Sequence, residues 1–173
     1  PARGGSALGC TKVTDAAELP AAVVTAFSYG DVAIVEEFIE GIEVAVTVLD
    51  LGEGPEALPA VQIQPRSGVY DYTARYTAGE TRFVAPAELP DDVGDACAEM
   101  ALTAHRVLGL RDLSRTDLIV RDGVPVFLEV NVAPGMTETS LVPLAIEAAD
   151  GSFAEVCARL ASRARERGRT DLS

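Results

Sequence analysis

The chain of 173 residues has few cysteines, few basic side chains and a single histidine, and each shortage excludes a kind of protein. Its three cysteines, Cys10, Cys97 and Cys157, lie far apart and form no C-x-x-C motif, so neither a zinc site nor a disulfide framework is indicated. No histidine accompanies Cys10, which argues against a nucleophilic thiol. The histidine itself, His105, lies within an expected helix beside Arg106 and is interpreted as a boundary residue rather than a base. A reducing, cytoplasmic setting is therefore expected.

Positive charge is also scarce, with 14 Lys and Arg against 27 Asp and Glu and a formal net charge of -13. This charge repels phosphate backbones, so no nucleic-acid partner is expected. No apolar run approaches the ~20 residues that a membrane helix needs, so no membrane partner is expected either. The remaining composition, 48% hydrophobic and 24% charged, is that of a globular protein with length for roughly one to one and a half domains.

The apolar pattern predicts helices and strands, with most strands joined as hairpins, which favours an α+β fold over a doubly wound sheet. Helices are expected at 15–28 and 91–109, from near 140, and from 152; strands are expected at 32–37, 43–49, 58–63, 113–120 and 124–131. Asp15 and Glu18 have the spacing of a capping box, and Pro20 places the start of the first helix near Leu19.

Single residues indicate the limits of the other helices. Asp91 is the expected cap of the second helix and Gly109 its end, while Val107 belongs to the apolar stripe between them. The last helix has a capping pattern at its start and an Arg-rich end, residues 159–169. Cations near a helix C-terminus favour its dipole, so this end is interpreted as solvated.

The predicted hairpin at 113–131 is the most informative segment. Strand alternation, with a three-residue loop at 121–123, places the even positions on one buried face, namely Thr116, Leu118, Val120, Val124, Val126, Leu128 and Val130. The opposite face then carries Arg115, Asp117, Glu129 and Asn131. Two carboxylates and an amide are hard ligands suited to Mg²⁺. The pattern also fits a solvated sheet face with an Arg–Asp pair, and paired carboxylates could do acid–base chemistry.

Three loops have features of a ligand site. The hairpin runs into Pro134-Gly135 and a helix start near Ser140, which presents backbone N–H groups to an anion and weakens the acid–base alternative. Residues 4–9 form a Gly-rich loop, which either lets the backbone approach phosphates closely or is merely a turn. The loop does not match a Walker motif. The acidic turn at 36–43 is either an exposed hairpin rim or an adenosine slot. The long polar stretch at 65–82 is typical of a lid.

Three of these segments together resemble the ATP-grasp superfamily and, within it, the D-alanine–D-alanine ligases. They are EEFIEGIE at 36–43, YDYTARY at 70–76, and LEVN at 128–131 followed by PGMT at 134–137 and SLVP at 140–143. The resemblance implies an ATP-grasp fold with antiparallel sheets packed against helices. Residues 1–63 would be part of the central domain, with the Gly-rich loop and an adenine-binding hairpin. Residues 64–173 would be the C-terminal domain, with the lid and the metal-binding hairpin.

The family joins two D-alanines for peptidoglycan precursors, using ATP and an acyl phosphate on the first one. The resemblance implies ATP and Mg²⁺ as cofactors, the magnesium ions as a pair that Mn²⁺ can replace, and a homodimer. The chain begins within a Gly-rich stretch, so an N-terminal part of the same protein is expected to precede it, and the chain alone is expected to be inactive. The alternatives are another ATP-grasp ligase for a different D-amino acid in secondary metabolism, or a non-catalytic cation-binding fragment.

Carried over residue by residue, the resemblance implies a role for each matching position. The metal ligands would be Asp117, Glu129 and Asn131. The groups at the reacting atoms would be Arg115, Ser6, Tyr76 and Gly135. The nucleotide would contact Glu36, Phe38, Ile39, Glu43, Arg75 and Leu128, and the carboxylate of the second amino acid would contact Ser140 and Leu141. The sequence departs from the family at Arg75, where a Lys is usual, and at Ala7, where a second Ser is common.

Overall fold

The computed structural model describes residues 1–68, 70, 72–77 and 79–170, with the backbone alone at 73, 76, 169 and 170. The chain forms two compact units: Pro1–Glu40 with Gln64–Arg82, and Gly41–Ile63 with Phe83–Ser173. The expected domains at 1–63 and 64–173 remain a prediction for the whole protein. In this structure, strands from both sides of residue 63 belong to one sheet.

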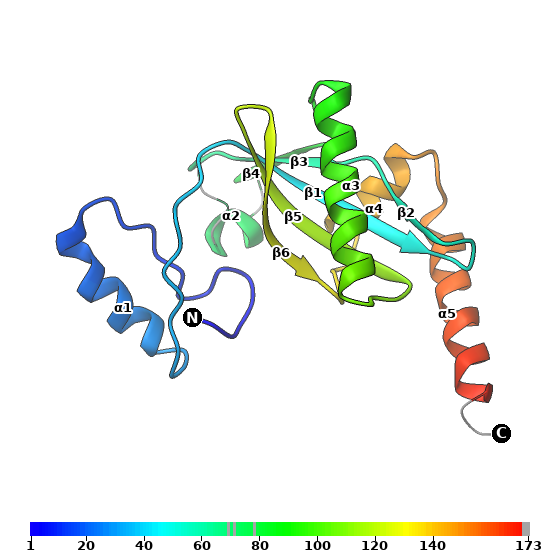
Figure 1. The fold of residues 1–173 in the computed structure, drawn as a ribbon, viewed down its shortest axis with the longest axis horizontal. Helices are drawn as coiled ribbons and strands as arrows, with labels where there is room; N and C mark the ends of the chain where they lie inside the picture. Colours follow the sequence, from blue (N-terminus) through cyan, green and yellow to red (C-terminus); the bar gives the residue numbers. More distant parts are fainter. Residues whose placement is uncertain (69, 71, 78, 171–173) are drawn as a thin grey trace. The chain divides into compact units, whose positions relative to one another are not determined.

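The sheet is built around its longest strands (Figure 1). Its strands are β1 (Ile42–Asp50), β2 (Pro55–Ala57), β3 (Val61–Pro65), β4 (Thr81–Val84), β5 (Leu113–Arg121) and β6 (Val124–Asn131). Their order is β4-β3-β1-β5-β6, and β2 pairs with β1 beside this path. The pairs of β1 with β2, β3 and β5, and of β5 with β6, are antiparallel, as the expected fold implies. β1 lies in the middle with six of its nine residues buried.

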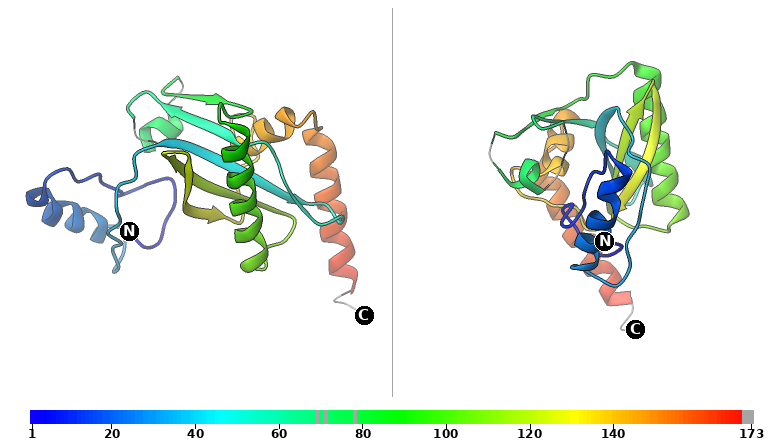
Figure 2. Two further views of the ribbon diagram at one scale, coloured as in Figure 1. Left: turned by 45° about the horizontal axis from the view of Figure 1, so that its top comes forward. Right: turned by 90° about the vertical axis from the view of Figure 1, so that its left-hand side faces the viewer.

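Helix α3 (Asp91–Val107) covers one face of this sheet (Figure 2). Its apolar stripe packs on the even positions of β1 and on β5, in a core of Val44, Val46, Val48, Val93, Cys97, Ala101, Leu118 and Val120. Burial raises the pKa of the Cys97 thiol, in keeping with an inert core cysteine. The predicted end of the helix is confirmed, since Gly109 has φ +61° and Leu110 N–H bonds to the His105 carbonyl.

Three expectations for α3 are wrong. The cap is Pro90 and not Asp91, which is the first helical residue. Val107 is exposed, because it follows the last turn that faces the sheet. His105 is buried and is no boundary residue, and its Nδ1 lies 2.8 Å from the Ser114 hydroxyl of β5. Burial lowers the pKa of His105 and thereby favours the neutral ring.

Helix α4 (Leu141–Ala148) packs on the opposite face, and α5 (Phe153–Thr170) packs against α4; Leu49, Val142, Ile146 and Val156 form the buried core that they share. The expected helix starts near 140 and at 152 are confirmed, and the N–H of Glu155 bonds to the Ser152 hydroxyl at 3.4 Å. No helix in the described part of the chain is long and apolar enough to cross a membrane.

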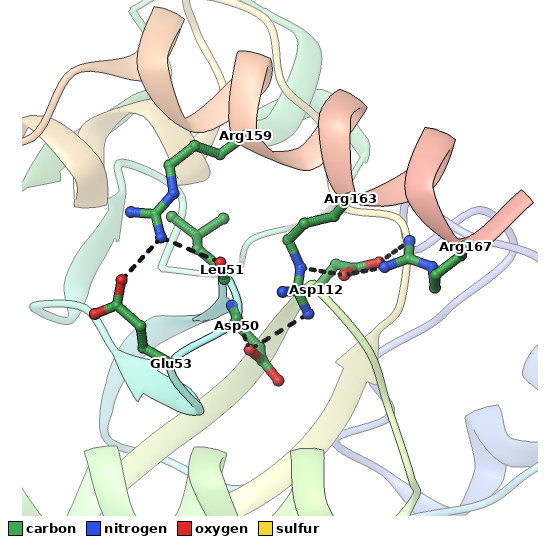
Figure 3. A network of polar contacts seen from close by, with 8 residues as sticks. Asp50, Leu51, Glu53, Asp112, Arg159, Arg163 and Arg167 are labelled. Atoms are coloured by element: carbon green, nitrogen blue, oxygen red, sulfur yellow. Dashed lines mark hydrogen bonds and ion pairs between the residues drawn. The ribbon is translucent and has the colours of Figure 1, made fainter. Parts of the chain in front are cut away.

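The Arg-rich end of α5 is not simply solvated, and Figure 3 shows the network that it makes. Arg167 donates to both carboxylate oxygens of Asp112, at 2.8 and 2.6 Å, and Arg163 Nε donates to Asp112 Oδ1 at 3.2 Å. One turn earlier, Arg159 donates to the Leu51 carbonyl and to Glu53, each at 3.1 Å. The spacing of four residues places all three arginines on one side of the helix, over the β1–β2 turn and the start of β5.

The smaller unit contains a 3₁₀ turn (Ala16–Glu18), α1 (Leu19–Phe27) and α2 (Tyr72–Tyr76). The predicted capping box is confirmed: Asp15 Oδ1 accepts the N–H of Ala17 at 2.9 Å, and Glu18 accepts the N–H of Asp15 at 3.4 Å. The start of α1 at Leu19, with Pro20 in its first turn, is confirmed as well. The expected lid at 65–82 includes residues 69, 71 and 78, which lie outside the described residues.

Two expected strands differ from the structure. Residues 32–37 form none, so the chain has no hairpin turning at Gly41; a strand needs a neighbour for its N–H and C=O groups, and no strand pairs there in the described chain. The strand expected at 58–63 is replaced by β2 and β3. Pro59, which has no N–H to give to a ladder, lies between them, and Ala60 bonds through its carbonyl to Ala87 instead.

Candidate functional site

The β5–β6 hairpin brings the four predicted polar residues onto one face. Arg115 lies directly opposite Asn131, and Asp117 directly opposite Glu129. Opposed residues of an antiparallel pair share a face, with their Cβ atoms about 5 Å apart. The predicted common face of these four side chains is therefore confirmed, and it is the face that α4 covers.

The turn and the strand register of this hairpin differ from the predicted ones. Its turn has only two residues, Asp122 and Gly123, both with positive φ, so that Arg121 pairs with Val124. A β-bulge then shifts the register between Asp117 and Leu118. The short turn and the bulge each shift the pairing by one residue in the same direction, so Arg115 and Asp117 pair two residues further along β6 than predicted. Because the strand period is two, a shift of two residues keeps the predicted face.

The predicted even face of β6 is wrong between the turn and the bulge. Phe127, and not Leu128, lies opposite Leu118, and Val126 lies opposite Ile119 on the other face. Leu128 and Val124 are 41% and 62% exposed, whereas the alternation predicted that both are buried. The turn is one residue shorter than predicted, and a shift of one residue is enough to move a side chain to the other face, because the strand period is two.

Arg115 and Asp117 form a bidentate ion pair within β5. Arg115 Nε donates to Asp117 Oδ1 at 2.6 Å, and Nη2 donates to Oδ2 at 2.8 Å. The two residues are only 8% and 5% exposed, so this is not the solvated Arg–Asp pair of the alternative interpretation. A buried charge of this kind needs its partner, and the fork geometry holds the carboxylate in one orientation.

The donor set at the hairpin fits a magnesium ion. Among the described residues, no group of three His, Cys, Asp or Glu side chains is placed to hold a metal. The predicted set instead combines two carboxylates, Asp117 and Glu129, with the amide of Asn131, whose Oδ1 accepts the N–H of Ala133 at 3.0 Å. Each of these oxygens keeps a further lone pair, and oxygen donors are what Mg²⁺ prefers.

The loop after β6 presents Ser140 at the start of α4. The Ser140 hydroxyl lies 3.1 Å from the N–H of Thr137 and 2.9 Å from the Thr137 hydroxyl. A Cβ at Gly135 would lie 2.8 Å from Ser140 Oγ, so only glycine leaves this hydroxyl undisturbed. The side chain of Leu141 is buried, which leaves its backbone N–H as the group that could meet a ligand. Sequence reasoning missed Thr137, although a hydroxyl three residues before a helix cap is a recognisable signal.

The remaining candidates divide between the two units. Glu43 belongs to the sheet, on the face of β1 that also carries Ala45, the residue opposite Asp117. The smaller unit holds Ser6, Glu36, Phe38, Ile39, Arg75 and Tyr76. The side chain of Tyr76 lies outside the described part of the chain.

Two aromatic contacts order the smaller unit. The Lys12 ammonium lies 3.6 Å from the centroid of the Phe38 ring and so links the end of the Gly-rich loop to the acidic segment. Arg75 stacks on Tyr70 at 4.2 Å, and its Nε donates to the Tyr70 carbonyl at 3.3 Å. Such cation–π contacts contribute about 0.5–1 kcal/mol at exposed sites. Ser6 has φ +59°, within the loop that was predicted to approach phosphates.

Solved structures similar to this chain include ligases. The chain is similar to the VanG D-Ala:D-Ser ligase from Enterococcus faecalis, with a TM-score of 0.82 and 35% identity over 94% of this chain and 47% of that one. It is similar to the D-alanine–D-alanine ligase from Bacillus anthracis complexed with ATP, with a TM-score of 0.72 and 25% identity over 89% of this chain and 49% of that one. The fold is thus an ATP-grasp fold, as predicted.

Residues 1–162 match the family model described as D-ala D-ala ligase C-terminus, and the chain belongs to this family. It is 45% identical to the D-alanine–D-alanine ligase of Anaeromyxobacter sp. (strain K) over 161 residues, which are 92% of this chain and 51% of that protein. It is 42% identical to the corresponding ligase of Syntrophotalea carbinolica over 160 residues, again 92% and 51%. The chain spans about half the length of the curated relatives that it matches.

Proposed function

We propose that the protein containing this chain is an ATP-dependent ligase that joins two D-alanines for peptidoglycan precursors, and that this chain supplies its ATP- and Mg²⁺-binding part. Membership of the family supports the proposal. The observation that carries it is the single sheet face that holds Arg115, Asp117, Glu129 and Asn131, followed directly in sequence by the loop that ends at Ser140.

The reaction begins with attack of the carboxylate oxygen of the first D-alanine on the γ-phosphorus of ATP, which releases ADP and leaves an acyl phosphate. The amine of the second D-alanine then attacks the acyl carbon, and the amide forms as phosphate and a proton leave. Asp117, Glu129 and Asn131 are suited to hold Mg²⁺, which when bound neutralises charge on the phosphates. The buried Arg115 guanidinium supplies fixed positive charge at the same face, where it favours the charge that develops on the transferring group.

The other proposed roles concern binding and the exclusion of water. Glu36, Phe38, Ile39, Glu43 and Leu128 would contact the adenosine, and Ser6 would cover the phosphates. Arg75 and Tyr76 would act in the lid, which protects the acyl phosphate from hydrolysis. Ser140 and the Leu141 N–H would receive the carboxylate of the second amino acid, with Gly135 near the intermediate.

A second candidate function differs in the amino acid used. The likeness to a D-Ala:D-Ser ligase at 35% identity favours a ligase that takes a different D-amino acid. Arg75 and Ala7, which depart from the usual family residues, are the positions in this chain where such a difference could lie.

The test is ATP-dependent phosphate release by the full-length protein, with D-alanine and with a panel of other D-amino acids. Glu129→Gln removes one carboxylate from the metal set and keeps the side-chain shape, so we expect activity to fall at least about tenfold. Glu99→Gln, on the exposed side of α3, is the matched control and should keep wild-type activity.

The outcomes separate the candidates. Release that needs D-alanine and Mg²⁺ and falls only in Glu129→Gln would support the D-alanine–D-alanine ligase. Release with another D-amino acid alone would support the second candidate. Cation binding without turnover of any substrate would contradict both, and would leave the non-catalytic fragment.

A further inference from the structure

Thr137 is tied to Ser140 by its backbone and by its side chain. The N–H of Ser140 donates to the Thr137 carbonyl at 2.8 Å, which closes a turn over residues 137–140. In return, the N–H of Thr137 donates to the Ser140 hydroxyl oxygen at 3.1 Å. The hydroxyls of the two residues lie 2.9 Å apart. Three contacts therefore fix where the Ser140 oxygen lies.

The Ser140 hydroxyl is not used to cap α4. Ser140 occupies the N-cap position with extended backbone angles, yet its side chain makes no bond to the first turn of the helix. Its oxygen faces back to Thr137 instead. The N–H groups of Leu141 and Val142 therefore receive no cap from this side chain, and the positive end of the helix dipole is available to an anion.

The contacts at the Ser140 oxygen allow an arrangement in which its proton faces away from Thr137. A serine hydroxyl accepts through two lone pairs and donates one proton. The N–H of Thr137 uses one lone pair, and the Thr137 hydroxyl, if it donates, uses the other. Both lone pairs are then occupied, so the Ser140 proton points away from Thr137 and is free to donate to a carboxylate.

We infer that Thr137 is a positioning residue for the second amino acid, because its hydroxyl donates to Ser140 and so directs the Ser140 proton to the substrate carboxylate. The inference rests on the proposed function. It adds to that function a residue whose contribution passes entirely through Ser140. Thr139, whose hydroxyl is 3.5 Å from that of Thr137, is at the limit of a hydrogen bond and has no such role.

The experiment measures the rate of the full-length ligase against D-alanine concentration, analysed with separate Michaelis constants for the first and second D-alanine, and against ATP. Thr137→Val keeps the shape and removes the hydroxyl. We expect the second Michaelis constant to rise about tenfold, equivalent to ~1.4 kcal/mol, while the constants for ATP and the first D-alanine stay unchanged. Thr137→Ser restores the hydroxyl and should restore the wild-type constant, and Thr139→Val is the matched control.

Each outcome is decisive. An unchanged second Michaelis constant in Thr137→Val would overturn the inference. So would failure of Thr137→Ser to restore it, or an equal loss for all substrates with a lower melting temperature, which indicates a merely structural role. A wild-type protein that turns over no D-amino acid would instead overturn the proposed function, and the inference with it.

Discussion

The Asp112 network of Figure 3 allows a sharp test of the structure, because one carboxylate holds two arginines of α5. Asp112 has φ +63°, a backbone conformation that Asp and Asn tolerate better than most residues. Asp112→Asn therefore preserves the backbone and the side-chain shape, removes the charge and leaves one acceptor oxygen. We expect the free energy of unfolding to fall, because Arg163 and Arg167 lose their charged acceptor.

The magnitude follows from the contacts. Hydrogen bonds to charged groups contribute about 1.5–3 kcal/mol each when shielded from water. The Asp112 side chain is 19% exposed and that of Arg167 36%, so solvent screening reduces this contribution, and the asparagine oxygen keeps one bond. A net loss of about 1.5 kcal/mol is expected, which corresponds to a fall in melting temperature of about 3–6 °C for a chain of this size.

The pH dependence of stability is a second test of the role of Asp112. Burial alone would raise the pKa of Asp112, but the hydrogen bonds from Arg167 and Arg163 outweigh it, so the pKa lies below the ordinary value of 3.8. A carboxyl with a lowered pKa stabilises the fold above its unfolded value, and that contribution is lost as the pH falls through the folded value. The difference between wild type and Asp112→Asn should therefore be full at neutral pH and shrink below about pH 4.

The assay is thermal and urea unfolding of both proteins, with Asp122→Asn as the matched control. Asp122 has the same backbone conformation, φ +53°, but lies in the exposed β5–β6 turn. Its substitution should change the melting temperature little. Equal stabilities for wild type and Asp112→Asn, or an equal loss in the control, would refute the reasoning.

Two further predictions concern buried polar groups. The Thr116 hydroxyl is fully buried and has no hydrogen-bond partner among the described residues, so Thr116→Val should raise the free energy of unfolding by about 1 kcal/mol; a less stable variant in urea unfolding would contradict this. Burial, with a contribution from Arg106, lowers the pKa of His105 below 6.5, although Asp50 and Asp112 oppose this. Because the pKa of His105 is lower in the folded protein than in the unfolded chain, protonation at low pH favours the unfolded chain. The free energy of unfolding of the wild type should therefore decrease as the pH falls from 7.5 to 5.5, about one unit either side of the unfolded pKa. The His105→Gln variant, whose side chain does not titrate, should lose less stability over this range. An equal change in the free energy of unfolding with pH for the two proteins would contradict a neutral buried His105.

Local signals predicted the elements that depend on neighbours in sequence. The capping box at Asp15 and the glycine end of α3 arise from contacts within a few residues, and the β5–β6 hairpin pairs two strands that follow one another in the chain. The strand expected at 32–37 failed for the opposite reason. An extended segment becomes a strand only when another strand pairs with it, and the pattern of one segment does not show whether a partner is present.

The candidate site shows the same division. Alternation placed Arg115, Asp117, Glu129 and Asn131 on one face, although it assumed a longer turn and no bulge. The result was right because the two differences add to a shift of two residues at Asp117, which is one full strand period. Between the turn and the bulge the shift is one residue, so Val124 moves to the other face, and Leu128 is the extra residue of the bulge itself; both are exposed.

The amino-acid sequence by itself determined which side chains are available for chemistry, their order along the chain and the family to which it belongs. The three-dimensional packing was needed to show that Arg115 and Asp117 are buried and that the α5 arginines bind Asp112. The physical reason is that burial and hydrogen-bond partners depend on register and on helix placement over the sheet. These are set by contacts between residues up to 108 positions apart, such as that of Arg159 with the Leu51 carbonyl, which no local pattern contains.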